Sequence, residues 1–435
     1  MSYRALLAAC LLFGCAPLPP VQASYRTLGQ GDVQRTAKAI AALRGWQLER
    51  TPPVSLDDRD AFTAARVRTG ARSVGHPASS TLATLFGVGP SPADAAAGKA
   101  KKAGKKENDV AGFYELDSGH VHVLAPKPRS DAEGLGQHGV LAHELIHALQ
   151  DQKFKLRSGA GMSADARLAY RALIEGDASA AQLAYGAALQ GLGVPRALRR
   201  ARYAIAEPQR VGPAASPTAD VGWASSPKAA ATLRGFPYQD GLAFVVDLYR
   251  AGGFALVDEA YGRLPSATEH ILHPEKYLAD EQPRAFSALQ PTNGITVVEW
   301  TAIGELLTRV VLEPCVGRKR AFAAAAGWNG DRAFVLSRDR SPMLGWVSAW
   351  DSESDAEAMY EALVELGGCL SDATVDGHTV SAKSAARREG AVVALVRGGD
   401  PGDHDPLIES LLALPGEAPP PTPLTKRVIP PLREP

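Results

Sequence analysis

The chain has 435 residues, of which 45% are hydrophobic and 22% charged. This is the composition of a globular protein with enough apolar material for two or three domains. Lys plus Arg and Asp plus Glu each number 47, so the formal net charge is zero. A neutral chain has no overall electrostatic attraction for polyanions, and we therefore expect no nucleic-acid partner.

Residues 1–23 have the pattern of an export signal. Arg4 precedes an apolar stretch, Ala5–Phe13, that is too short to span a bilayer. The sequence Leu-Phe-Gly-Cys that ends at Cys15 resembles a bacterial lipobox, which would make Cys15 the lipidated membrane anchor of a cell-envelope lipoprotein. The alternative is ordinary secretory cleavage before Ser24, which would give a periplasmic or secreted protein. Both interpretations put the mature chain outside the cytoplasm.

Residues 24–108 are predicted to form a helical extension followed by a flexible linker. An Ala-rich helical pattern runs from Gln34 to Leu43, and a second helix is expected after Asp57 or Asp58, either of which can cap it. Residues 70–108 are rich in Gly, Ala, Ser, Pro and Lys and have no sustained period, so we expect a long flexible connection there. The extension could also serve as a pro-segment that masks a cleft.

Residues 109–289 are predicted to form a mainly helical core. At its start, Val110–Leu116 and His120–Leu124 flank a Gly-containing turn, which indicates a β-hairpin. A helix is expected from about Gly136 to Lys155. A second helix is expected from about Ser163 to Gln190, with a serine cap at its start and a Gly-rich stop after its end.

Residues 290–415 are predicted to form a smaller α+β domain, and the Pro-rich residues 416–435 a disordered tail. Cys315 and Cys369 both lie in this domain. In an oxidising compartment two such cysteines can pair, and we predict a disulfide, with two separate buried thiols as the alternative. The strands expected here are Ile295–Trp300, Ala333–Leu336, Leu344–Trp350 and Ala391–Val396, and the helices are Thr301–Leu312 and Ser354–Leu366.

The pentapeptide His143-Glu144-Leu145-Ile146-His147 is the most informative motif of the chain. Residues four apart lie on one face of a helix, so two imidazoles can converge on one metal ion while the glutamate lies beside the metal-bound water. Apolar residues at 141, 145, 148 and 149 occupy the roughly opposite face, which leaves the histidine face for a cleft. An amphipathic helix with two incidental histidines is the alternative.

A hydrolytic zinc site needs a third protein ligand and an open position for water. Gln150 and Lys153 stand where the metzincin pattern would have Gly and His, so the third ligand must come from farther along the chain. The second predicted helix offers Glu175, our first choice, and Asp177 as the rival. The two point to opposite faces of a regular helix, and both faces are apolar enough to be internal, so periodicity does not decide between them.

The segment from His143 to Asp151 resembles the zinc helix of the thermolysin-like gluzincin metallopeptidases, including an Asp one turn after the second His. The resemblance covers about Val110–Gln190. It implies Zn²⁺ held by His143, His147 and Glu175, with Glu144 as the general base. One position departs from the pattern, because Ser179 stands where thermolysin relatives carry an Asp that orients a ligand histidine. Asp151 could take that role or be a surface carboxylate or structural cap.

By this resemblance the protein is an exported zinc metallopeptidase that acts on peptides or proteins. The predicted hairpin could align an extended substrate at a free strand edge, or be purely structural. Four residues are candidates for a second group that stabilises the oxyanion, with His273 preferred because the proline after it fixes its backbone. They are Tyr238, His270, His273 and Tyr277.

The predicted fold class is therefore α+β, with a mainly helical metallopeptidase core, a short β-hairpin and a smaller C-terminal α+β domain. The alternative function is a zinc-binding envelope lipoprotein without proteolytic activity that acts as a scaffold or binding module. An intact Glu144 favours the enzyme, because a non-catalytic metal site does not need its base.

Overall fold

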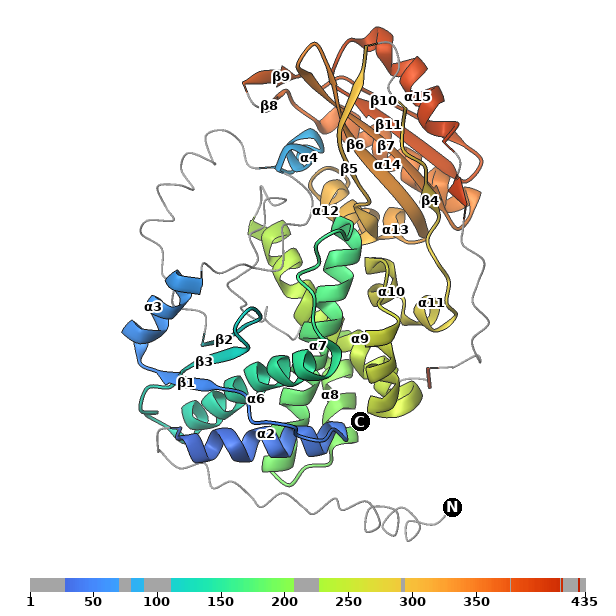
Figure 1. Cartoon of the computed structure of the whole chain (residues 1–435). Helices are drawn as coiled ribbons and strands as arrows, with labels where there is room; N and C mark the ends of the chain where they lie inside the picture. Colours follow the sequence, from blue (N-terminus) through green and yellow to red (C-terminus); the bar gives the residue numbers. More distant parts are fainter. Residues whose placement is uncertain are drawn as a thin grey trace.

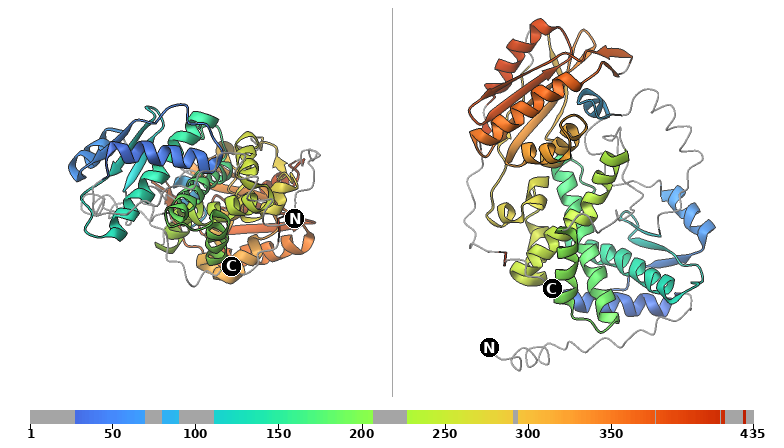
Figure 2. Two further views of the ribbon diagram at one scale, coloured as in Figure 1. Left: turned by 90° about the horizontal axis from the view of Figure 1, so that it is seen from below. Right: turned by 180° about the vertical axis from the view of Figure 1, so that it is seen from behind.

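The computed structural model describes residues 28–69, 80–89, 111–206, 227–290, 294–375, 377–414, 416–417 and 429–430. The fold is of the mixed α+β type (Figure 1). Long helices with a small three-stranded sheet form one lobe, and a five-stranded sheet with helices on both faces forms the other. Figure 1 and the right view of Figure 2 show helix α2 (Gln30–Arg44) at the end of the helical lobe that is remote from the five-stranded sheet.

The N-terminal residues belong to the helical lobe. Helix α2 (Gln30–Arg44) begins four residues before the predicted start, and Gly45 ends it in the left-handed conformation at φ 69°. Strand β1 (Val54–Asp57) follows, and then helix α3 (Arg59–Thr69). The Asp58 carboxylate accepts a hydrogen bond from the Ala61 amide, so Asp58 caps α3 as one of the two predicted alternatives.

The predicted hairpin is confirmed as strands β2 (Gly112–Glu115) and β3 (His120–Leu124), which pair in antiparallel register. Strand β1 adds to the other side of β3 in parallel, which gives the order β1-β3-β2. Among the strands that the structure describes, β2 pairs only with β3, so its outer edge is free of strand partners.

Two helices form the centre of this lobe. Helix α6 (Asp131–Phe154) starts five residues before the predicted start, where Ser130 accepts a hydrogen bond from the Glu133 amide. Helix α7 (Ala164–Leu189) has the predicted cap, because the Ser163 hydroxyl accepts a hydrogen bond from the Ala166 amide. Their inner faces pack with α2 and the small sheet in one apolar cluster.

Two further helices complete the lobe, α8 (Val194–Ala206) and α9 (Pro227–Gly262), the second with non-helical backbone at Gly252 and Gly253. Helices α7 and α9 cross at a pair of glycines. A Cβ atom at Gly176 would lie 2.2 Å from the carbonyl oxygen of Gly241. This close crossing needs glycine on both helices, and it brings the preceding turn of α9 beside the middle of α7.

The C-terminal elements form the sheet β10-β11-β7-β6-β5, in which all neighbours are antiparallel. Helices α12 to α14 pack on one face with Trp328 and Trp346, and α15 packs on the other. The structure pairs Cys315 with Cys369, as predicted. The elements are α10 (Thr268–Leu272), α11 (Pro274–Leu278), β4 (Ala285–Phe286), β5 (Thr296–Thr301), α12 (Gly304–Val316), α13 (Arg318–Ala325), β6 (Trp328–Arg338), β7 (Ser341–Trp350), α14 (Glu353–Cys369), β8 (Ala373–Val375), β9 (His378–Val380), β10 (Ser384–Glu389), β11 (Val392–Arg397), η1 (Pro401–Asp403), α15 (His404–Leu412) and β12 (Gly416–Glu417).

The prediction of a flexible linker over residues 70–108 is wrong for one segment. Ser80–Leu85 forms helix α4, and its Leu82 and Leu85 are fully buried in the core of the C-terminal lobe. Phe86 packs edge-on against Trp346, with ring centroids 5.1 Å apart. The helix is too short for periodicity to reveal, and its stability comes from these distant contacts.

The predicted disordered tail is wrong at Gly416–Glu417, which pair with β4. The expected signal segment with Cys15, the rest of the linker and most of the tail lie outside the described residues. None of the helices within the described ranges is long and apolar enough to cross a membrane.

Candidate metal centre

Helix α6 supplies both histidines of the predicted motif. His143 and His147 lie one turn apart, and their ring centroids are 4.8 Å apart in an edge-on arrangement. The opposite face of the helix is apolar, with Leu141 and Leu145 fully buried in the cluster shared with α2 and the small sheet. The helix is therefore fixed by its apolar side and presents its imidazoles toward α7.

Glu175 of α7 completes the group. Its Oε2 atom lies 3.3 Å from Nε2 of His143 and 3.4 Å from Nε2 of His147, and the donor atoms of the three residues all lie within 4.8 Å of one another. Two ligands that bind zinc tetrahedrally at about 2.1 Å are about 3.4 Å apart. The spacing and the donor set of two imidazoles and one carboxylate both fit a zinc ion.

Asp177 is not the third member of this group. Its side chain is fully buried on the other side of α7, where it forms an ion pair with Arg44 of α2. Asp177 Oδ2 also accepts hydrogen bonds from Gln150 Nε2 and from the Tyr261 hydroxyl, both at 2.9 Å. The structure thus separates the two candidate carboxylates that periodicity left open.

Two glutamines hold the outer nitrogens of the imidazoles. Nδ1 of His147 lies 3.0 Å from Oε1 of Gln150, and Nδ1 of His143 lies 3.2 Å from Oε1 of Gln182. This role of both residues was not predicted from the sequence. Spacing is the signal that could have found them, because Gln150 is three residues after His147 and Gln182 is seven after Glu175, on the same helix faces.

Asp151 does not orient a ligand histidine. Its Oδ2 accepts a 2.6 Å hydrogen bond from the Tyr114 hydroxyl of β2, and its Oδ1 accepts one from the Leu156 amide. The first bond fastens the edge strand to α6, and the second helps to end the helix. These contacts support a structural role for Asp151.

Glu144 lies beneath the edge strand. Its side chain is buried, and burial raises the pKa of its carboxyl group. The β2 backbone approaches so closely that a Cβ atom at Gly112 would lie 2.6 Å from Cγ of Glu144 and 2.8 Å from Cγ1 of Val140. The Glu144 side chain is thus held against the face of β2 at Gly112.

The charges of the group are strongly coupled. Burial by itself lowers the pKa of His147, but the hydrogen bond and charge of Glu175 outweigh it and raise that pKa to about 9. Burial likewise opposes ionisation of Glu175, yet His143 and His147 hold its pKa well below the usual range. Both pKa shifts have the same cause, because the Glu175 carboxylate lies close to both imidazoles.

Two more side chains lie beside the group. The ring of Tyr238, on the turn of α9 just before the α7–α9 crossing, is stacked on His143 with centroids 6.2 Å apart. Arg171 lies one turn before Glu175 on α7, with its Nε atom 3.9 Å from Oε1 of Glu175. Tyr238 is the one of the four oxyanion candidates that the structure brings into contact with a predicted ligand.

The preferred candidate, His273, is not brought to the group. It lies between α10 and α11, where hydrogen bonds with Glu275 and Glu305 raise its pKa to about 9. Helix α10 joins α7 at Asp165, where Thr268 donates to the carboxylate. Asp165 is ten residues from Glu175, or about 15 Å along the helix. The preference for a proline-fixed backbone did not account for this distance.

His270 and Tyr277 have structural contacts. His270 is buried with Nε2 2.6 Å from the Glu281 carbonyl oxygen, and burial lowers its pKa. The Tyr277 hydroxyl donates to the carbonyl oxygen of Arg263. A second acidic group, Glu269 with Glu281 and Asp351, surrounds the ammonium group of Lys276, which forms ion pairs with all three carboxylates. The Lys276 ammonium group thus lies among these carboxylates, where a cation could otherwise bind.

Comparison with known proteins gives one partial match. Residues 295–407 match a domain of unknown function (DUF8575). The match covers less than half of the chain and does not include His143, His147 or Glu175. No curated protein and no solved structure matches the chain.

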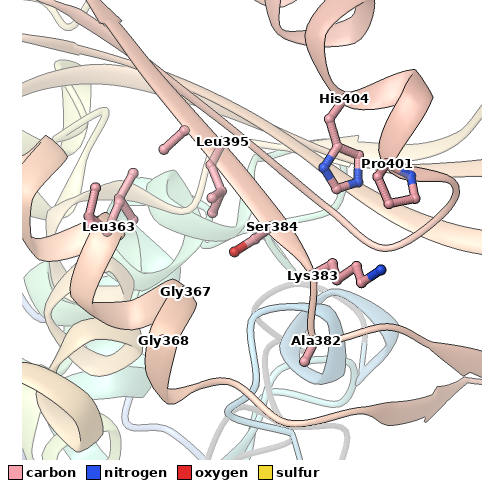
Figure 3. A pocket seen from close by; sticks show the side chains of 11 residues that line it. Leu363, Gly367, Gly368, Ala382, Lys383, Ser384, Leu395, Pro401 and His404 are labelled. Carbon is pink, nitrogen blue, oxygen red and sulfur yellow. The ribbon is translucent and has the colours of Figure 1, made fainter.

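The matched region contains a cavity of about 620 Å³ (Figure 3). It is lined mainly by apolar and small residues of α14, β10 and β11, with Lys383, Ser384 and His404 as its polar side chains. His404 is already bonded through Nε2 to the Gly398 carbonyl oxygen. The residues that line the cavity include neither an acidic side chain nor a second histidine, so this cavity lacks the donor set that the α6–α7 group has.

Proposed function

We propose that this chain is an exported zinc metallopeptidase that hydrolyses peptide bonds. The observation that carries the proposal is the convergence of His143, His147 and Glu175 on one point, with Glu144 of α6 held against β2 at Gly112. Two imidazoles and a carboxylate with an open fourth position are the donor set of catalytic zinc sites. A zinc ion bound there would polarise the scissile carbonyl and lower the pKa of a water molecule.

The residues of the chain supply the remaining steps. An extended peptide can pair with the outer edge of β2, which puts its backbone next to Glu144. Glu144 accepts the proton of the attacking water and then passes it to the leaving amine. The Tyr238 hydroxyl, on the ring stacked against His143, is the proposed donor to the oxyanion.

Export remains part of the proposal, as a cell-envelope lipoprotein anchored through Cys15 or as a periplasmic or secreted protein. Structural disulfides persist in oxidising compartments and are rare in the cytosol. The bond between Cys315 and Cys369 therefore supports a location outside the cytoplasm.

The test compares wild-type protein with Glu144→Gln, using exposed Glu361→Gln on α14 as the matched control. Zinc per chain is measured by elemental analysis, and hydrolysis with a fluorescently labelled denatured protein and a random peptide library. We expect all three proteins to retain zinc, and only Glu144→Gln to lose hydrolysis. Zinc binding without cleavage by the wild type would instead favour the non-proteolytic envelope protein.

A further inference from the structure

We propose that Arg44 of helix α2 is a positioning residue for the metal ligand His147. It acts through a buried chain of hydrogen bonds that runs from Arg44 to Asp177, Gln150 and His147. The proposal rests on the metal site proposed above, but it does not depend on peptide cleavage. Helix α2 then contributes to metal binding, although the sequence predicted it only as part of an N-terminal extension.

The first step fixes the orientation of the Gln150 amide. Its Nε2 atom lies 2.9 Å from Asp177 Oδ2 and 3.2 Å from the Ile174 carbonyl oxygen. Both partners are acceptors, so this side of the amide must be the NH₂ group. The amide oxygen therefore faces Nδ1 of His147 at 3.0 Å.

The second step fixes the proton of His147. An amide oxygen can only accept, so Nδ1 of His147 carries the hydrogen and donates it. In the neutral imidazole the lone pair is then on Nε2, the atom that lies 3.4 Å from Glu175. A metal ligand needs this tautomer, and outer partners of ligand histidines set it in known metal sites.

The third step concerns the charge that holds Gln150. Asp177 is fully buried and would be costly as an isolated carboxylate. Its cation is Arg44, whose side chain is equally buried. Arg44 also pairs with Asp258 at 2.6 Å, and its guanidinium lies 4.2 Å from the Trp46 ring centroid and 4.6 Å from that of Phe254. Burial opposes its charge, but Asp177 outweighs burial and raises the pKa of Arg44, so the guanidinium remains charged.

Replacement of Arg44 should therefore change the proposed metal site through the orientation of the Gln150 amide. Without Arg44 the Asp177 carboxylate is no longer held in place, and the Gln150 NH₂ group loses its strongest acceptor. The amide can then rotate and present NH₂ to Nδ1 of His147, which moves the imidazole proton to Nε2. That tautomer cannot bind a metal ion without losing its proton.

The experiment uses the full-length protein and measures the zinc Kd by competition with a chelator. Arg44→Met removes the charge and keeps the length of the side chain, and Arg44→Lys keeps the charge. The control is Arg35→Met on the same helix, where the side chain is 59% exposed. We expect zinc binding 10- to 100-fold weaker in Arg44→Met, a smaller loss in Arg44→Lys, and wild-type affinity in Arg35→Met.

Two further measurements separate positioning from a general loss of structure. In a double-mutant cycle with Gln150→Met, the two losses should not add, because both variants break the same chain. Nitrogen-15 NMR of the imidazoles in the metal-free protein, recorded at a pH above the His147 pKa of about 9 so that this ring is neutral, should show a change of tautomer at His147 and none at His143. If Arg44→Met does not fold, the affinity and tautomer of Arg44→Lys decide the question.

Folded Arg44 variants with a zinc Kd within twofold of wild type, or losses that add to that of Gln150→Met, would overturn the proposal. Wild-type protein that binds no zinc would instead overturn the proposed function. The two failures are thus distinguishable in the same titration.

Discussion

Replacing Gly112 with alanine tests how closely the edge strand β2 fixes Glu144. The added Cβ would lie 2.6 Å from Cγ of Glu144 and 2.8 Å from Cγ1 of Val140. Carbon atoms in contact prefer about 3.5–4.0 Å, so the strand and the carboxylate must separate by about 1 Å. A displacement of about 1 Å in a catalytic group can cost on the order of 100-fold in rate.

The assay follows kcat/KM for a peptide selected from the library, zinc per chain, and the free energy of unfolding. We expect kcat/KM to fall by on the order of 100-fold while zinc content is unchanged, because the atoms nearest the new Cβ belong to Val140 and to the proposed base Glu144, not to the proposed ligands. Gly136→Ala is the matched control, since its Cβ would enter open space on the exposed side of α6. It should retain full activity.

A Gly112→Ala variant that keeps zinc and has kcat/KM within about threefold of wild type would refute this reasoning. It would mean that Glu144 does not take the proton of the attacking water, or that β2 moves freely relative to α6. Loss of zinc in this variant would show instead that the strand supports the whole metal site.

Three other changes test separate parts of the structure. Tyr238→Phe should lower kcat by on the order of 100-fold with zinc unchanged, and an unchanged kcat would remove the phenol from the reaction. Burial raises the pKa of Asp240 to about 6. The carboxyl group therefore binds its proton more tightly in the folded protein than in the unfolded chain. The free energy of unfolding should fall as pH rises from about 4 to 6 and then level off. Asp240→Asn should lose that part of the slope in urea unfolding of the metal-free protein, whereas parallel profiles would contradict the assignment. Replacing Cys315 and Cys369 with serine, which opens a link between residues 54 apart, should cost about 4 kcal/mol of unfolding free energy, and a loss below about 1 kcal/mol would contradict that role.

The features that the sequence predicted well depend on local pattern. The hairpin β2–β3 follows from alternation and a glycine turn, and α7 begins at its serine cap. The spacing of His143 and His147 on one helix placed their imidazoles together because the α-helical repeat requires it.

The features that it missed depend on contacts between distant residues. Helix α4 is short and lies among residues without a period, and its burial against Trp346 could not be inferred from either segment alone. Strand β1 pairs in parallel with β3 across more than sixty intervening residues. His273 was preferred for its local backbone, whereas its position depends on how α10 packs at the start of α7.

Glu175 and Asp177 show how packing determines which of two carboxylates faces the histidines. Two residues apart on one helix, they point to opposite sides, and both sides of α7 are internal. Neither carboxylate can be buried without positive or hydrogen-bonding partners, so the neighbouring elements assign the roles. Helix α6 brings imidazoles to Glu175, and α2 brings the guanidinium of Arg44 to Asp177. Which of the two acids faces the histidines therefore depends on which helix packs on which face of α7, and the N-terminal helix α2 contributes to the proposed ligand set by pairing with the other acid.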